Sequence, residues 1–443
     1  MLIRDAQLAD GRVRDVRVRD GRIVTVGRNL QENDDRVLDA HGNLLLPGAI
    51  DVHVHFREPG DSHKETWTTG SRSAAAGGVT TVVDQPNTDP PTTTGEAFDE
   101  KAALARDSLV DYGINGGVTP DWDPDSLFER PLFALGEVFL ADSTGDMGID
   151  VDLFREALER ARDADVPVTV HAEDADLFSE AARERSDVPE SDPLGSTRDG
   201  GRPADADAWS AFRTAEAEIA AVERACDVAV DAGTTIHVAH TSTPEAVDLA
   251  HEAGMTCEVT PHHLYLSRDD YEELGTFGRM NPPLRSDGRR ADLFARLDDG
   301  TVDVVATDHA PHTRAEKDAS IWDAPSGVPG VETMLPLLLD SARRGDLHYE
   351  RIRDVTARNP ARLFGLPEKG RIAEGYDADL VLVDPDAPRE IRGAALHTNC
   401  EWTPFEGRQG VFPLWTMVRG ELVYERTGED ERFGDAVGEN VRE

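Results

Sequence analysis

The sequence is poor in cysteine and contains no long apolar run. Its three cysteines, Cys226, Cys257 and Cys400, lie far apart, and none belongs to a CxxC motif. Neither a disulfide scaffold nor a cysteine-ligated zinc site is therefore indicated. No stretch is apolar over the roughly 20 residues that a membrane-spanning helix requires, and the N-terminal MLIRDAQLAD does not have the layout of a signal peptide. These absences predict a soluble protein of the cytoplasm.

Lysine is also scarce, while acidic residues are abundant. Lysine occurs only at Lys64, Lys101, Lys317 and Lys369, and 87 Asp and Glu stand against 46 Lys and Arg, a formal net charge of −41. This excess repels nucleic acid and anionic membranes, so we expect neither as a partner. The acidic residues are spread along the whole chain. We interpret them as an adaptation to a salty cytoplasm, because concentrated salt screens the self-repulsion.

Length and composition indicate one barrel-sized domain with a smaller addition. The chain has 443 residues, of which 39% are hydrophobic, so it can bury a large core. Apolar segments alternate with Ala/Glu/Arg-rich segments, which is typical of a parallel sheet with crossover helices. The eight candidate strands are AIDVHVHF, GVTTVVDQP, DYGINGGV, PLFALGEVFL, PVTVHA, TIHVAHTS, TCEVTPHHL and VDVVATDHA. The helical candidates include residues 67–78, 96–109, 151–164 and 215–233. The pattern predicts an α/β fold with a (β/α)₈ TIM-type barrel, whose active site lies at the C-terminal ends of the strands.

The two ends of the chain follow a different pattern. RVRDVRVRDGRIVTVG alternates strictly and contains a DG turn, which predicts an antiparallel hairpin. KGRIAEGYDADLVLVDPDA and GVFPLWTMVRGELVYERTG have the same character. We expect residues 1–47 and 366–430 to form a small β-sandwich built from both chain ends, flanking a barrel at 48–365. The acidic residues 431–443 are expected to form a loosely ordered tail.

Side chains that can bind metals recur at the ends of the predicted barrel strands. They are His53 and His55 on the first strand, Glu137 on the fourth, His171 on the fifth, His240 on the sixth and Asp308 on the eighth. Imidazoles and carboxylates gathered at one barrel mouth suit a borderline metal such as zinc, with a carboxylate that bridges two ions or acts as a base. A single HVH pair is more often a core or surface feature, and it is the recurrence that favours a metal site.

These residues resemble those of the cyclic amidohydrolases of the amidohydrolase superfamily, and most closely the class I dihydroorotases. The resemblance spans the whole chain and rests on HFREPG, GGVTTVVDQPNTDP, VTVHAED, HVAHTSTPEA, EVTPHHL, MNPPLR, TDHAPHT and ARNPARLFGL…KGRIAEGYDADLVLVD. Several of these motifs are shared with allantoinases and hydantoinases. Arg57 discriminates between them, because the resemblance assigns it to the free carboxylate of dihydroorotate. A planar fork of donors matches a carboxylate bidentately.

The resemblance implies two zinc ions and reversible hydrolysis of dihydroorotate to N-carbamoyl-aspartate, a step in pyrimidine biosynthesis. His53 and His55 would bind the first ion and His171 and His240 the second, while Asp308 would complete the first site and act as general base and acid. The implied substrate-binding residues are His55, Arg57, Asn87, Asn281, His312, Ser326 and Gly327. Ser326 stands where the family usually has an aromatic residue. The main-chain contacts that the resemblance implies tolerate this change, whereas packing against the substrate ring does not follow from the resemblance.

Many relatives join the two metals through a carboxylated lysine on the fourth strand, and this chain differs from them at that position. None of the lysines of this chain lies on that strand. We expect Glu137 to bridge the metals through its own carboxylate, with Asp142 as the alternative. Allantoinase or hydantoinase activity stays an alternative, as does a non-catalytic paralogue with a structural role, although such a paralogue usually loses metal ligands. The sequence leaves the oligomeric state and the metal loaded open.

Overall fold

The computed structural model describes residues 1–33, 35–140, 147–186 and 203–443. Its eight barrel strands are β6 (Ala49–Val54), β7 (Val79–Asp84), β8 (Asp111–Ile114), β9 (Leu135–Leu140), β11 (Val168–Ala172), β12 (His237–Val238), β13 (Thr256–Val259) and β14 (Val304–Val305). β6, β7 and β8 form one parallel sheet, and β10 (Gly148–Ile149) joins the other five in a second. Parallel bridges from Gly116 to Leu135 and from Val54 to His309 close the barrel. All eight predicted strands are present, although the seventh is shorter than predicted and ends at Val259.

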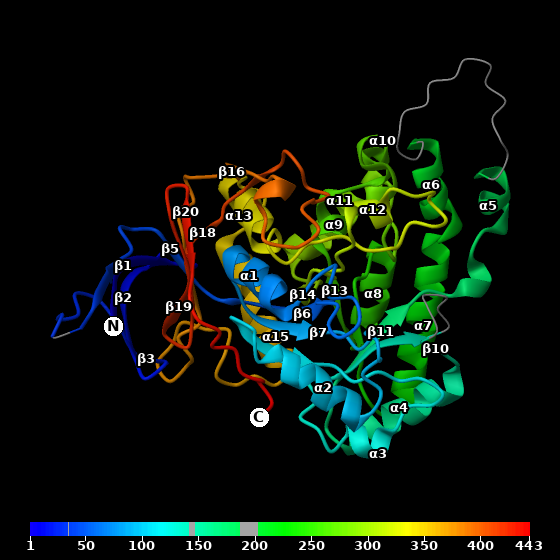
Figure 1. Ribbon diagram of the computed structural model, residues 1–443, viewed down its shortest axis with the longest axis horizontal. Helices are drawn as coiled ribbons and strands as arrows, with labels where there is room; N and C mark the ends of the chain where they lie inside the picture. Colours follow the sequence, from blue (N-terminus) through cyan, green and yellow to red (C-terminus); the bar gives the residue numbers. More distant parts are fainter. Residues whose placement is uncertain (34, 141–146, 187–202) are drawn as a thin grey trace.

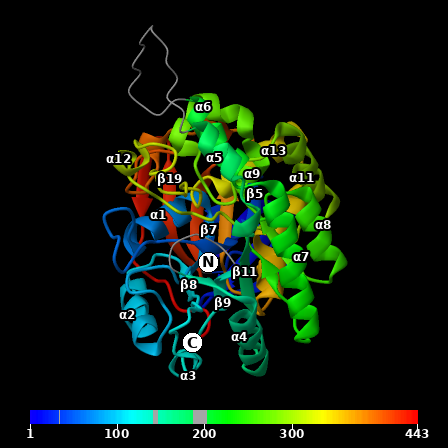
Figure 2. The same cartoon turned by 90° about the vertical axis from the view of Figure 1, so that its right-hand side faces the viewer.

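Helices follow the strands and surround the barrel (Figures 1 and 2). The principal ones are α1 (Trp67–Gly77), α2 (Gly95–Ala105), α3 (Pro124–Leu127), α4 (Val151–Asp163), α7 (Ala215–Asp231), α8 (Pro244–Glu252), α11 (Asp287–Asp299) and α13 (Met334–Arg344). The others are α5 (Glu180–Ser186), α6 (Pro203–Phe212), α9 (Pro261–Tyr265), α10 (Tyr271–Leu274), α12 (Arg314–Lys317), α14 (Tyr349–Arg353) and α15 (Asn359–Leu363). Threonine hydroxyls cap the first turns of α1, α2, α7 and α8, which explains where these helices begin. The four predicted helices are confirmed as α1, α2, α4 and α7.

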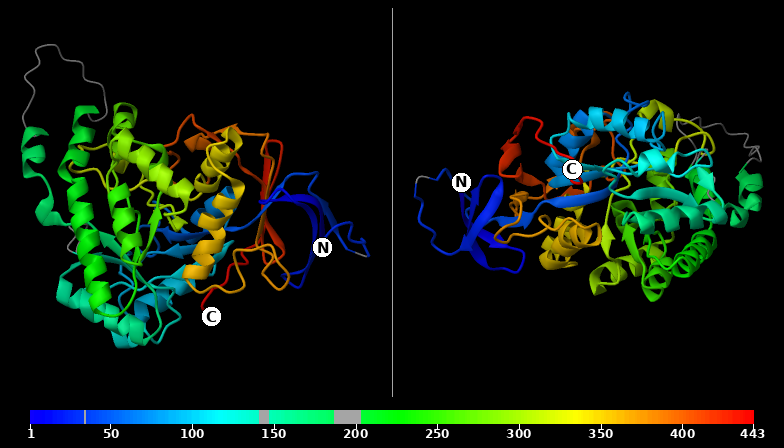
Figure 3. Two further views of the ribbon diagram at one scale, coloured as in Figure 1. Left: turned by 180° about the vertical axis from the view of Figure 1, so that it is seen from behind. Right: turned by 90° about the horizontal axis from the view of Figure 1, so that it is seen from below.

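Both ends of the chain contribute to one nine-stranded sheet beside the barrel (Figures 1 and 3). Its strands are β1 (Leu2–Leu8), β2 (Val13–Arg19), β3 (Arg22–Gly27), β4 (Val37–Asp39), β5 (Leu44–Pro47), β15 (Leu380–Val383), β18 (Pro413–Val418), β19 (Glu421–Thr427) and β20 (Asp430–Phe433). β5 pairs antiparallel with β15, so the two chain ends meet at this ladder. Asp20 and Gly21 have φ of 49° and 77°, and a type I′ turn needs both values positive. The predicted hairpin is therefore confirmed.

The acidic C-terminal residues are ordered, and the expectation of a loose tail is wrong. β20 pairs with β19, and the Glu439 amide donates to the Asp111 carboxylate at 3.0 Å. Asn440 forms a parallel bridge with Tyr112, and the Arg442 guanidinium donates to the backbone carbonyl of Phe364 at 2.6 Å. These residues satisfy polar groups at the N-terminal end of the barrel, a contact that local composition does not reveal.

Apolar side chains fill the space between the barrel strands and the surrounding helices. This core includes Val82, Val138 and Val170 from the strands and Phe154 and Val222 from the helices, all fully or almost fully buried. A separate cluster packs within the sheet of the two chain ends. Among the described residues, no helix has both the length and the apolar character to cross a membrane.

Candidate metal centre and active site

The six predicted metal-binding residues converge at the C-terminal ends of the barrel strands. They lie on or directly after five of them, His53 and His55 at β6, Glu137 on β9, His171 on β11, His240 after β12 and Asp308 after β14. Each side chain is buried, with 7% exposure or less. Parallel strands present their C-terminal ends at one face of a barrel, so residues far apart in sequence meet there.

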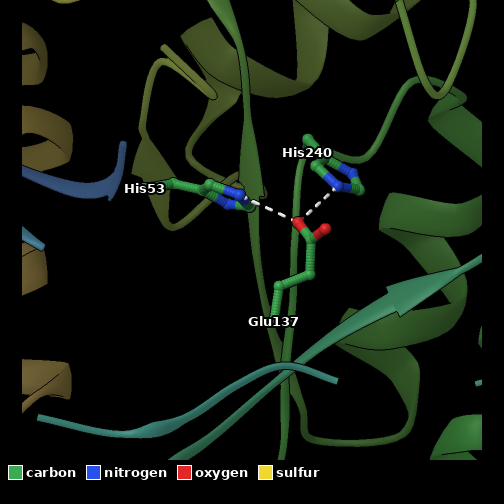
Figure 4. Close-up of side chains that lie close together, drawn as sticks. All are labelled: His53, Glu137 and His240. Carbon is green, nitrogen blue, oxygen red and sulfur yellow. Dashed lines mark hydrogen bonds and ion pairs between the residues drawn. The ribbon is translucent and has the colours of Figure 1, made fainter. Parts of the chain in front are cut away.

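Glu137 lies at the centre of this cluster (Figure 4). Its Oε2 is 2.8 Å from Nε2 of His53 and 2.9 Å from Nε2 of His240, and its Oε1 is 3.5 Å from Nδ1 of His171. Gly136 precedes it with φ of 141°, and a Cβ there would collide with Thr169. Glycine thus permits the backbone that directs the Glu137 carboxylate into the barrel. The alternative bridge, Asp142, lies outside the described residues.

A second group shares His53 with the first. Oδ1 of Asp308 is 3.0 Å from Nε2 of His55 and 3.7 Å from Nε2 of His53. Within each group, His53 with Glu137 and His240, or His53 with His55 and Asp308, the potential ligand atoms all lie within 4.8 Å of one another. The structure therefore offers two adjoining places for a metal ion, with His53 between them.

The outer nitrogens of three imidazoles are held by acceptors, which leaves their inner nitrogens facing the cluster. Nδ1 of His53 is 2.6 Å from Glu258, Nδ1 of His55 is 2.7 Å from Oδ1 of Asn87, and Nε2 of His171 is 3.2 Å from Glu173. When the outer nitrogen carries the proton and donates it, the inner lone pair is free to bind a cation. The donor set of imidazoles and carboxylates suits a borderline metal such as zinc.

The buried charges favour a bound cation. Burial opposes ionisation of Glu137, but the neighbouring His240 and His53 hold the pKa of its carboxyl well below the usual range. Burial also lowers the pKa of His53, yet Glu137 and Glu258 outweigh it and raise that pKa well above normal. The protonated imidazoles thus compensate the buried carboxylates, and a metal ion bound in place of their inner protons would do the same.

Two buried carboxylates behind the cluster were missed by the sequence reasoning. Glu258 on β13 contacts Nδ1 of His53 and, at 3.2 Å, accepts from the backbone amide of His240. Glu173 contacts His171 and forms an ion pair with Arg213. A charged residue inside the apolar strand TCEV was the available signal for Glu258, because such a residue is rarely buried without a partner.

The placement of His262 and His263 on the seventh strand is wrong. β13 ends at Val259, and both histidines belong to α9. Thr260 caps this short helix and Pro261 begins it, which stops the strand pairing. Nε2 of His263 is 2.9 Å from the backbone carbonyl of Pro282, so this side chain contacts the protein backbone and is not one of the clustered metal-binding residues.

The predicted substrate-binding residues lie in two contact groups beside the metal-binding cluster. Nη2 of Arg57 is 3.1 Å from Nε2 of His312, which lies 2.9 Å from the backbone carbonyl of Ser326. The Ser326 hydroxyl donates to Oδ1 of Asn281 at 3.2 Å. Gly327 has φ of 132°, and a Cβ there would meet Ala310. Asn87 and His55 form the second group, with Nδ1 of His55 2.7 Å from Oδ1 of Asn87. The structure brings together all the residues that the sequence singled out for substrate.

Three of the site residues have left-handed backbone conformations. The φ values are 65° for Arg57, 31° for His240 and 46° for Asp308. Residues with a Cβ rarely adopt this region, and each such position costs on the order of 1–3 kcal/mol. The surrounding fold must stabilise them, and such strain is concentrated at sites where a side chain has to be aimed.

Comparison with known proteins agrees with this architecture. The chain is 66% identical over 448 residues to the dihydroorotase of Halobacterium salinarum, with 100% of both chains covered. It is 44% identical to the dihydroorotase of Methanosarcina mazei, over 91% of this chain and 89% of that protein. The solved structure of L-hydantoinase (dihydropyrimidinase) from Arthrobacter aurescens matches with a TM-score of 0.90 at 28% identity, covering 99% of this chain and 98% of that one. Residues 44–423 match the family model, and this chain belongs to the amidohydrolase family.

Proposed function

We propose that this chain is a zinc-dependent dihydroorotase that interconverts dihydroorotate and N-carbamoyl-aspartate in pyrimidine biosynthesis. The similarity to curated dihydroorotases along the full chain supports this hydrolase activity on a cyclic amide. The observation that carries the substrate choice is Arg57, a half-buried guanidinium at the mouth of the barrel beside His312. A carboxylated ring is the substrate that such a cation recognises.

Two zinc ions would be held by the six clustered side chains. His53, His55 and Asp308 would hold one, His171 and His240 the other, and Glu137 would join them. When bound, the ions supply Lewis-acid polarisation of the ring carbonyl and lower the pKa of water. Glu258, Asn87 and Glu173 orient the imidazoles, which raises the basicity of the inner nitrogens.

Asp308 would move the proton. Burial opposes its ionisation, but the hydrogen bond with His55 and the nearby histidines lower the pKa of its carboxyl below the usual value. The ionised carboxylate can take a proton from the attacking water as the water oxygen bonds to the ring carbonyl carbon. It then gives that proton to the ring nitrogen as the C–N bond breaks. The reverse sequence closes the ring and releases water.

The substrate carboxylate would be held by Arg57 with Asn87 and His312. Burial lowers the pKa of His312 well below its usual value, and the adjacent Arg57 lowers it further, so the imidazole is neutral and can donate one hydrogen bond. Backbone groups at Ser326 and Gly327, with Asn281, would meet the amide edges of the ring. Holding the ring at both ends determines which carbonyl is presented for attack.

The direct test is the turnover of dihydroorotate, hydantoin and allantoin by protein purified in molar salt, with zinc content measured in the same sample. We expect turnover of dihydroorotate and little of the two rings that lack its carboxylate. A preference for hydantoin or allantoin would favour the other cyclic amidohydrolase activities. The similarity to a Halobacterium protein supports the interpretation of the −41 charge as salt adaptation, so dilute buffer is unsuitable for this assay.

A further inference from the structure

We propose that Lys317 is a positioning residue that clamps together two substrate-binding loops, residues 279–281 and 325–327. Through this clamp its ammonium group would determine substrate affinity without touching either the substrate or the metal-binding cluster. The inference rests on the proposed function, because these loops carry the residues assigned to the substrate ring.

The hydrogen bonds of Lys317 carry the argument. Its side chain, at the end of α12, is fully buried. Nζ donates to three backbone carbonyls, those of Arg279 at 2.9 Å, Pro325 at 2.9 Å and Gly327 at 3.1 Å. An ammonium has three N–H donors, whereas a neutral amine has two and would turn its lone pair toward an oxygen. The three acceptors fit the ammonium form, and no uncharged side chain presents three N–H donors at one nitrogen.

The clamp reaches the substrate-binding residues through short contacts. The Arg279 carbonyl that accepts from Lys317 also accepts from the Gly327 amide at 3.0 Å. The Arg279 side chain donates from Nε to the Ser326 hydroxyl at 3.2 Å, and that hydroxyl donates to Asn281. A shift at the Lys317 ammonium would thus change the spacing of Asn281, Ser326 and Gly327 together.

Lys317 differs from the other lysines of the chain. Lys64, Lys101 and Lys369 each form an ion pair with at least one aspartate, at 2.6–2.8 Å. Lys317 has no ion pair within the part of the chain that the structure describes. Burial strongly lowers the pKa of its ammonium, and the charges of Arg279 and Arg57 lower it further. A buried cation without a counter-ion is costly, so its presence in a lysine-poor chain indicates a specific role.

The uncompensated charge also suits the chemistry of the reaction. Dihydroorotate carries one carboxylate and N-carbamoyl-aspartate carries two, so both ligands are anions. Lys317 and Arg57 act on the same region, since both lower the pKa of His312. A positive potential in a poorly hydrated site attracts an anionic ligand at longer range than a hydrogen bond does.

The test compares Lys317→Met with Lys369→Met, a matched buried lysine. Lys369 binds Asp111 at the start of β8, at the end of the barrel opposite the candidate site. In metal-loaded protein in molar salt, we expect Lys317→Met to raise the KM for dihydroorotate by about tenfold or more, the effect of losing roughly one hydrogen bond. Its zinc content should be unchanged and its kcat less affected, while the Gly327 amide should exchange its hydrogen faster. Lys369→Met should lower Tm and leave KM unchanged.

A KM within about twofold of wild type, or unchanged Gly327 exchange, would overturn the clamp. If Lys317→Met does not fold, Lys317→Gln keeps two N–H donors without the charge and is judged by the same two outcomes. The exchange measurement needs no substrate. Failure of the wild-type protein to turn over dihydroorotate would therefore reject the proposed function while the clamp is still tested.

Discussion

Replacing Arg57 with lysine tests the assignment of the substrate carboxylate. The Arg57 guanidinium donates from Nε to the Pro311 carbonyl at 3.3 Å and lies 3.1 Å from His312. Within the described residues it forms no ion pair, so its charge is available to a ligand. Lysine keeps the charge and tolerates the φ of 65° equally, but it cannot present two parallel N–H groups.

The expected loss follows from one charge-assisted hydrogen bond. Such a bond contributes about 1.5–3 kcal/mol, which corresponds to a fall in kcat/KM of roughly 10- to 150-fold. Spectroscopic rates on dihydroorotate at several concentrations separate KM from kcat, and we expect KM to carry most of the change. Zinc content should remain that of wild type. The matched control is Arg314→Lys, at an exposed arginine that donates to the backbone carbonyl of Glu401. Equal kinetics for Arg57→Lys and wild type would refute the reasoning.

Four further outcomes are expected. Asp308→Asn can still ligate a metal but cannot carry a proton, so kcat should fall by roughly 10²-fold or more; near-normal turnover would mean another base. Glu137→Gln should weaken at least one zinc site in a metal titration. The activity of the wild-type protein should not depend on bicarbonate. If the variant still binds two ions tightly, Glu137 is not the bridge and Asp142 is the next residue to test. The melting temperature should rise from dilute buffer to molar salt as the −41 charge is screened, and a flat salt series contradicts this. For His397, burial lowers the pKa, but Glu332 and Glu431 raise it to about 10. The stabilisation is then complete below the unfolded pKa of about 6.5 and lost as pH rises through about 10, so denaturant unfolding across this range should show a steeper loss for wild type than for His397→Gln.

Local patterns predicted the barrel and the kinds of polar side chain at its strand ends, because both depend on short-range properties. Strands β6 and β11 carry the imidazoles of His53 and His171 one residue before their last residue, where a polar side chain can reach the mouth of the barrel. The hairpin at β2 and β3 was equally readable, since its DG turn favours two positive φ values. The substrate-binding roles of Arg57 and His312 could be predicted only from the family resemblance, because an arginine or histidine in a loop can have many other roles.

Contacts between distant segments could not be predicted. Glu258 and His53 are 205 positions apart, and nothing near either residue indicates the other. The C-terminal residues have a composition typical of a tail, yet they are ordered because their backbone bonds to the Asp111 carboxylate and pairs with the strand at Tyr112. Glu137 points into the barrel because Gly136 adopts a φ that other residues avoid.

The sequence by itself therefore determined the order of strands and helices, the kinds of polar side chain at the strand ends and the acidic composition, since periodicity and composition are properties of short segments. Only the tertiary structure determined which carboxylate contacts which imidazole and which carbonyls accept hydrogen bonds from the Lys317 ammonium. These pairings depend on the packing of the whole barrel, because a hydrogen bond between remote residues forms only where the fold brings donor and acceptor within about 3 Å.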